Sequence, residues 1–423
     1  MTDRTAASPG SAAGEWRANW GLALSSFLGM SVIAIPAVTL GIYMEPLEQA
    51  FGWTRAEISL GMTVFALITT PLAPFAGALA DRFGSRRLVL PGLVLNGLAF
   101  AAFSLMTGWF ALYAACWVAY SFSQLLIRTT VWNRALSANF HVSRGLALAV
   151  VMLGLSLTQT AAPVLTQKLV AAFDWRTAFA AIGIGWPGLA FIVALVLFRE
   201  RRDAPQTSGS SEPDDKPAEF GLTFSEAIRS LPVWRIILAM TLYSLVMSGL
   251  SMHLFPFLTD SGIARSSAAG VIALIGVSAL AGQIVTGFLA DRTSSALLPF
   301  GCFVLLALAL IVLLQATGSQ SGLTFGVVLA GLSSSACVTI GTYLITRYAG
   351  VRHFGKIYGI ASSGMGLGSG IGPILAGHIR DSSDSYSLFL MIGLALSVIA
   401  TILVTRLGPY PVFLPPVETP KET

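Results

Sequence analysis

Gly77-Ala-Leu-Ala-Asp81-Arg82 recurs as Gly287-Phe-Leu-Ala-Asp291-Arg292, 210 residues further along a chain of 423. Each copy follows an apolar run and ends in charged residues, which continue in the first copy through Gly84-Ser85-Arg86-Arg87. Self-similarity at a fixed shift is the signature of a repeated structural unit. The chain is therefore predicted to use one unit twice.

The same shift superposes eleven identical pairs at positions with structural meaning, most of them glycines, prolines or charged residues near the ends of apolar runs. The pairs are Gly52 and Gly262, Arg55 and Arg265, Gly77 and Gly287, Asp81 and Asp291, Gly108 and Gly318, Gly145 and Gly355, Gly154 and Gly364, Pro163 and Pro373, Asp174 and Asp384, Phe179 and Phe389, and Gly183 and Gly393. Because the shift needs no insertions, the two copies are predicted to have the same orientation.

The composition places the chain in a membrane. Of its residues 55% are hydrophobic and 11% are charged, whereas about a quarter are charged in a soluble domain. Apolar runs of roughly 20 residues, each long enough to cross a bilayer as a helix, recur along the whole sequence. We predict twelve spans, at 20–42, 56–79, 88–107, 110–133, 144–167, 177–198, 233–255, 267–289, 296–316, 322–346, 356–378 and 387–407.

The basic residues predict the topology. With the N-terminus inside, 19 of the 25 Lys and Arg residues lie on inner segments, five on outer segments and one within a span. Inner loops of membrane proteins carry such an excess. Both termini are therefore predicted in the cytoplasm, a bacterial inner membrane is the expected location, and the net charge of +5 is explained without nucleic acid.

The repeat and the polar segments together set the domain organisation. We predict a cytoplasmic tail at 1–19, a six-helix half at 20–198, a cytoplasmic linker at 199–231, a second six-helix half at 232–407 and a cytoplasmic tail at 408–423. The linker is rich in Pro, Ser, Asp and Glu between Arg199 and Glu219, a composition typical of flexible connections. A short helix beginning near Thr223 or Ser225 is predicted to lead into the seventh span.

The stretch from Gly77 to Arg87 resembles the signature loop of the major facilitator superfamily, and the resemblance covers essentially the whole chain. It implies an all-α fold of two parallel six-helix repeats with a substrate path between them. Asp81, Arg82 and Arg86, with Asp291 and Arg292 of the shorter copy, are then expected to form a cytoplasmic gate. The alternative is that these residues are ordinary charges at the membrane surface that only set the topology.

Within that superfamily, several stretches are similar to the monocarboxylate porters: Phe51-Gly52-Trp53-Thr54-Arg55, Arg144-Gly145-Leu146-Ala147, Asp174-Trp175-Arg176 and the segment from Phe354 to Gly359. This resemblance implies small organic acids as substrates. An Asp and an Arg four residues apart, usual in the eighth span of those porters, are replaced by Ala279 and Gln283. No proton-coupling role is carried over from that pair.

Arg128 is the one Lys, Arg, Asp or Glu well inside a predicted span. A charge in the membrane is costly unless it faces a cavity or a partner, and a guanidinium binds a carboxylate through two parallel hydrogen bonds. Tyr120, Gln124 and Arg128 recur every four residues and so share a helical face. We predict that they bind the substrate; the alternative is that Arg128 lines the inner vestibule or pairs with a gate carboxylate such as Asp81.

Three further residues are weaker candidates for substrate binding. Tyr243 and Gln283 lie at a suitable depth in the seventh and eighth spans, although each can equally satisfy a neighbouring helix. His253 lies near the outer end of the seventh span, and histidine is the residue type that can change charge near neutral pH, although a lone histidine is more often an interfacial residue.

These features predict a secondary transporter of a small organic anion, a monocarboxylate or a related carboxylate, that works by alternating access. Protons are a possible coupling ion, and lipids are the expected surroundings. An exporter of drug-like or other metabolites on the same fold is the alternative. The sequence has no ATP-binding motif and no metal-ligand spacing among its four histidines, so neither a cofactor, a metal nor an enzymatic activity is expected.

Overall fold

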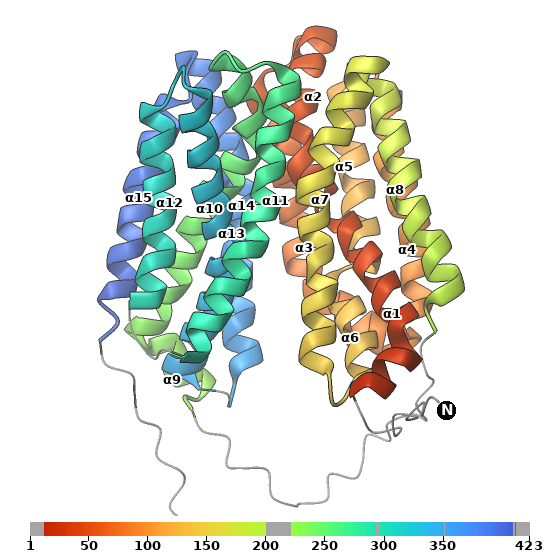
Figure 1. Ribbon diagram of the computed structural model, residues 1–423, viewed down its shortest axis with the longest axis vertical. Coiled ribbons are helices and arrows are strands. Elements are labelled where there is room, and N and C mark those ends of the chain that lie inside the picture. The colour runs from red at the N-terminus through yellow and green to blue at the C-terminus, as the bar shows by residue number, and fades with distance from the viewer. Residues whose placement is uncertain (1–11, 200–220, 293–296, 351, 409–410, 412–423) are drawn as a thin grey trace, which may run out of the picture.

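A computed structural model describes residues 12–199, 221–292, 297–350, 352–408 and 411 (Figure 1). Apart from one isolated bridge between Gly221 and Gly350, the regular structure of this part is helical. Its helices are α1 (Ala12–Ile33), α2 (Ile35–Phe51), α3 (Arg55–Phe83), α4 (Ser85–Ala101), the 3-10 helix η1 (Ala102–Leu105), α5 (Phe110–Leu126), α6 (Thr129–Asn139), α7 (Arg144–Ala172), α8 (Trp175–Leu197), α9 (Phe224–Arg229), α10 (Leu231–Asp260), α11 (Arg265–Arg292), α12 (Leu297–Gln315), α13 (Gln320–Ala349), α14 (Phe354–Ser383) and α15 (Ser387–Thr405).

Each of the twelve predicted spans coincides with one helix or with two consecutive helices. The first span is α1 and α2, which meet at Ala34 just before Pro36, where the missing proline N–H interrupts a helix. The fourth span is α5 and α6, which meet at Ile127 and Arg128. By length and composition, nine helical segments of the described chain can cross a membrane, and Phe300–Gln315 is a shorter apolar helix. The predicted tails and linker fall largely outside the described residues.

The helices form two bundles whose elements correspond. α3 begins at Arg55 and α11 at Arg265, α5 at Phe110 and α13 at Gln320, and α7 at Arg144 and α14 at Phe354, each pair 210 residues apart. Gly52 and Gly262 both have positive φ, as do Gly108 and Gly318. Since these turns need a left-handed residue, the repeat preserves the loops as well as the helices. One apolar core lies within α1–α8 and another within α9–α15, with single residues exchanged between them.

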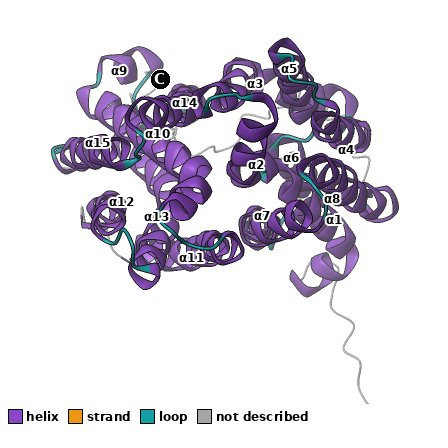
Figure 2. Ribbon diagram, turned by 90° about the horizontal axis from the view of Figure 1, so that it is seen from above, coloured by secondary structure: helices purple, strands orange, loops and turns teal. Residues whose placement is uncertain are grey.

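The two bundles meet along three pairs of helices. Figure 2 shows α3 beside α14, α7 beside α11, and α2 close to α10. α14 approaches α3 through glycines, since a Cβ on Gly370 would lie 2.7 Å from Cβ of Ala66, and one on Gly377 would lie 2.7 Å from N of Ala56. Small residues at a helix interface permit this approach, so the glycine-rich sequence of α14 is a packing surface.

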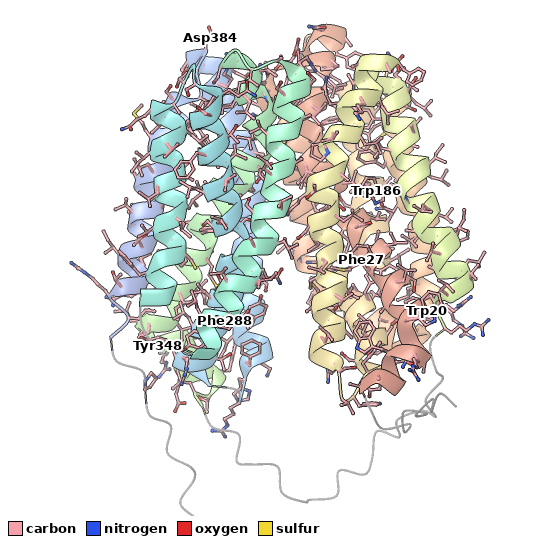
Figure 3. All side chains as sticks on the ribbon, in the orientation of Figure 1. Trp20, Phe27, Trp186, Phe288, Tyr348 and Asp384 are labelled. Carbon is pink, nitrogen blue, oxygen red and sulfur yellow. The ribbon has the colours of Figure 1, made fainter. Side chains whose placement is uncertain are left out.

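The bundles are in contact at one end and apart at the other. We call the lower end of Figure 1, where α1 begins and α15 ends, the termini end, and the opposite end the distal end. Figure 3 places Asp384 at the distal end and Trp20, Phe288 and Tyr348 at the termini end. The close contacts of α14 with α3 run from Gly377 to Gly366, that is, from the distal end to about the middle of both helices.

Candidate functional site

A cavity of about 250 Å³ lies where the bundles separate. α14 contributes Gly366 and Ser369 to the lining, and all of the remaining lining residues belong to the first bundle. Those residues are Ile33, Met62, Phe65, Ala66, Thr69, Thr70, Gln124, Arg128 and Thr129. The cavity thus has an apolar wall from α1 and α3, several hydroxyl groups and one cationic side chain.

The cationic side chain lies at the interruption of the fourth span. Arg128 has φ −63° and ψ 153°, an extended conformation between α5 and α6. Trp132 Nε1 donates to the carbonyl oxygen of Ile127 at 2.8 Å, which satisfies an acceptor that the interruption would otherwise leave free. Leu126 and Ile127 pack against Gly92, where an added Cβ would lie 2.7 Å from Cβ of Leu126. The interruption is therefore held by packing as well as by a hydrogen bond.

Arg128 reaches from this point to α3. Its Nη1 donates to the carbonyl oxygen of Thr69 at 3.0 Å, and the side chain is half-buried. In the described part of the chain Arg128 takes part in no ion pair, and Asp81 instead pairs with Arg134, whose Nε lies 2.8 Å from Oδ1. The pair between Arg128 and Asp81, which was considered as an alternative to substrate binding, is therefore not formed in this conformation.

Gln124 lies one helical turn before Arg128 and lines the same cavity. Its Nε2 donates to the carbonyl oxygen of Ile33 and to the hydroxyl of Tyr120, each at 3.1 Å. Tyr120 is 1% exposed and packs against Phe65. Gln124 and Arg128 thus both line the cavity, with Tyr120 buried behind them, although the helix predicted to carry all three ends at Leu126.

The three weaker candidates lie elsewhere. Tyr243 is buried in the second bundle, where its hydroxyl lies 2.9 Å from Oγ of Ser333. Gln283 is half-buried on α11 and is not among the residues that line the cavity. His253 is buried near the distal end of α10. The structure therefore brings none of them to the cavity around Arg128.

The predicted gate residues of the first bundle lie at the termini end. Asp81 is exposed, and Arg82 lies over the ring of Phe83. Arg86 donates to the carbonyl oxygens of Leu195, at 2.8 Å, and Phe198, so it caps the C-terminal end of α8. The side chains of Asp291 and Arg292 lie outside the described set.

A polar cluster at the distal end joins the bundles, and no sequence pattern predicted it. Arg55, 8% exposed, donates to Asp260 of α10 at 2.8 Å and to the hydroxyl of Tyr386 at 2.8 Å. Asp381 of α14 accepts from the backbone N–H groups of Arg55, at 3.1 Å, and Ala56, at 2.8 Å. The signal available in the sequence was the repetition of Arg55 as Arg265.

His253 belongs to this distal cluster. Its Nε2 lies 2.9 Å from the carbonyl oxygen of Pro373 and 3.0 Å from Oγ of Ser59, and its Nδ1 lies 2.9 Å from the hydroxyl of Tyr386. Because a carbonyl only accepts, Nε2 carries the proton and Nδ1 accepts from Tyr386. Burial is the main cause that raises the pKa of Tyr386 above its ordinary value, which keeps this donor protonated. His253 thus links α10, α3 and α14.

Comparisons with known proteins agree with this architecture. A family model described as the Major Facilitator Superfamily matches residues 21–327 and 300–423. Monocarboxylate transporter 13 of Bos taurus is 24% identical over 400 residues, covering 93% of this chain and 89% of the relative. Monocarboxylate transporter 11 of Homo sapiens is 25% identical over 414 residues, covering 93% and 84%. A solved bacterial homologue of the human lysosomal transporter Spinster superposes with a TM-score of 0.69 at 18% identity, covering 94% of each chain.

Two parallel six-helix bundles with a cavity between them define a membrane transporter that crosses the bilayer many times. The chain belongs to the major facilitator superfamily. It is accordingly an integral membrane protein that carries a small-molecule substrate, and not an enzyme. It is similar to the monocarboxylate transporters across nearly all of its length.

Proposed function

We propose that this chain is a secondary active transporter that moves a small organic anion, a monocarboxylate or a related carboxylate, by alternating access. The observation that carries the proposal is Arg128, which lines the cavity between the bundles and has no acidic partner among the described residues. A cation there is costly unless it meets an anion. The two monocarboxylate transporters similar to this chain support the same substrate class.

The lining favours one carboxylate with an apolar body. Arg128 is the cationic side chain of the lining, and Met62, Phe65 and Ala66 offer an apolar wall. A second carboxylate on the substrate would lose water against this wall without gaining a cation, and burying an unpaired charge is costly. We therefore expect monocarboxylates to bind more tightly than dicarboxylates of similar size.

The transport cycle follows from the contacts between the bundles. In this conformation the distal cluster around Arg55 joins them, whereas the Asp81 region lies at the end where they separate. With both termini in the cytoplasm, as the positive charges favour, this conformation faces inward. Rocking of the bundles would open the distal cluster and bring the Asp81 region into contact with the second bundle.

Binding and flux measurements on the purified chain test this proposal. A thermal-shift screen compares propionate, benzoate and succinate with the neutral amides propionamide and benzamide. Flux into proteoliposomes, with and without a pH gradient, then tests transport and coupling to protons. Stabilisation by a monocarboxylate but not by its amide is expected. Binding of only neutral or cationic compounds would overturn the organic-anion assignment and favour an exporter of drug-like metabolites.

A further inference from the structure

We propose that the N-terminal amides of α6, those of Thr129 and Thr130, form the carboxylate site together with Arg128. This inference rests on the proposed function, because it names the groups that hold the anion in the same cavity. The fourth span is interrupted, and the second part of it, α6, starts at the cavity rather than at a membrane surface.

The interruption leaves backbone donors free, among them those of the first two residues of α6. Arg128 is the N-cap of α6 but makes no capping hydrogen bond with its side chain. Val131 N donates to the carbonyl oxygen of Arg128 at 2.9 Å, whereas the N–H groups of Thr129 and Thr130 have no hydrogen-bond partner in the part of the chain that is described. The first amides of a helix point out of its N-terminus, where the helix dipole favours an anion.

The free amides adjoin the cationic side chain. Arg128 and Thr129 are consecutive, and both line the cavity. An anion bound there would accept from the guanidinium and from the helix N-terminus together. Because Trp132 and Gly92 hold the interruption in place through the contacts described above, these donors are positioned before a ligand arrives, which lowers the cost of binding.

A second observation also points to a ligand in this cavity. Gln124 lines it, is 5% exposed, and its Oε1 has no hydrogen-bond partner among the described residues. The orientation of this amide is fixed, because only its nitrogen can donate to the carbonyl oxygen of Ile33. Buried polar atoms are almost always paired. Gln124 Oε1 is therefore a free acceptor for an O–H or N–H of a substrate that reaches it.

Position 129 offers a selective test. Proline is favoured at the first residue of a helix, where it removes one N–H without breaking the helix. The preceding residue must be extended, and Arg128 already has ψ 153°. Thr129→Pro therefore removes the proposed donor, while Thr129→Val removes only the hydroxyl and keeps the N–H. A backbone ester at position 129, made by incorporating the α-hydroxy analogue of threonine, removes the same N–H without a ring.

We would measure the affinity of each variant for whichever of propionate, benzoate and succinate binds the wild type most tightly. The thermal midpoint of each variant checks that it is folded. Thr129→Pro and the ester are expected to weaken binding about tenfold or more, as for a hydrogen bond to a charged group, and Thr129→Val less than about twofold. If Arg128→Gln weakens binding and the ester does not, the amide site is wrong and the proposed function stands. If Arg128→Gln also leaves the affinity unchanged, or no carboxylate binds the wild type, both are wrong.

Discussion

Arg55 and Asp260 form an ion pair between the two bundles, with Nη1 of Arg55 2.8 Å from Oδ2 of Asp260. The repeat supplies a second ion pair, in which the arginine belongs to the second bundle and the carboxylate to the first: Arg265, the counterpart of Arg55, binds Glu45. The duplicated arginines thus tie each bundle to the other at the distal end.

Both partners of the first pair have another partner within their own bundle. Arg55 Nε lies 2.7 Å from Oε1 of Glu48, and Asp260 Oδ2 lies 3.0 Å from Nε of Arg380. If the distal end opens, neither charge is left alone, which keeps the cost of breaking the pair low. We infer that this cluster is suited to repeated opening and closing.

Asp260→Asn is expected to favour opening at the distal end, because it removes the charge shared by Arg55 and Arg380. For the measurement, Cys116, Cys302 and Cys337 are replaced by Ser, and Met62, which lines the cavity, is replaced by Cys. The rate at which a membrane-impermeant thiol reagent labels this cysteine reports whether the cavity is accessible. Labelling from the distal side should rise several-fold. The control is Asp384→Asn, which removes an exposed pair within one bundle. Equal labelling in both variants would contradict a role for the ion pair in closure.

Gly377→Ala should hinder closure of the distal end. Its Cβ would lie 2.7 Å from N of Ala56, a backbone atom, whereas a Cβ on Gly359 of the same helix would meet nothing within 4 Å among the described residues. Overpacking of this kind costs about 1–3 kcal/mol. Both variants gain the same helix propensity, so Gly359→Ala is a matched control. Transport rates in proteoliposomes should fall only for Gly377→Ala, and a similar rate in both would refute the close-contact argument.

Asp81→Asn is expected to change the rate of transport more than the affinity for substrate. Asp81 pairs with Arg134 at the surface, and exposed pairs contribute about 0–1 kcal/mol to stability. The thermal midpoint should therefore change little. Turnover and thiol accessibility of the cavity from the two sides would both be measured. If neither changed, the gate assignment of Asp81 would be wrong.

Asp174→Ala should destabilise the fold by about 1 kcal/mol through loss of an N-cap. Asp174 Oδ1 accepts from Thr177 N at 2.6 Å, and this backbone hydrogen bond lowers the pKa of the carboxyl. Stabilisation by a carboxyl with a lowered pKa is present above its ordinary value and is lost as the pH falls through the folded-state value. The thermal midpoint of Asp174→Ala should thus lie below that of the wild type at pH 7, and the difference should be smaller in acid.

The counterpart Asp384 gives the control for that measurement. It has φ 52°, lies after α14 rather than capping the next helix, and pairs with Arg380 at the surface. Asp384→Ala is expected to cost less than about 1 kcal/mol. A larger loss of stability at Asp384 than at Asp174 would contradict the capping argument.

The sequence was sufficient to predict the helices because their signal is local. Apolar runs and a constant shift place the starts of α3 and α11, and of α7 and α14, at equivalent residues. The spacing of Gln124 and Arg128 predicts a shared face of one helix; both residues line the cavity, but the helix ends at Leu126, before Arg128. Their role in binding stays a prediction.

The distal cluster and the interruption of the fourth span needed the structure. Arg55 lies 205 residues from Asp260 and 326 from Asp381 along the chain, and a single sequence does not reveal which distant charges meet. No glycine or proline lies between Phe110 and Asn139, so the sequence predicts a continuous helix. The structure shows what holds the interruption in place: the hydrogen bond from Trp132 to the Ile127 carbonyl, and the packing of Leu126 and Ile127 against Gly92 of another helix.

The most direct measurement of the central claim is the affinity of wild type, Arg128→Lys and Arg128→Gln for a monocarboxylate and for its neutral amide. Arg87→Gln, an exposed arginine in the first turn of α4, is the control for a general loss of positive charge. Because lysine keeps the charge but loses the paired donors, we predict that benzoate binding weakens about tenfold or more in both Arg128 variants. It should stay unchanged in Arg87→Gln, while benzamide binds none of the proteins measurably. Unchanged carboxylate affinity and transport in both Arg128 variants would contradict the proposed substrate site.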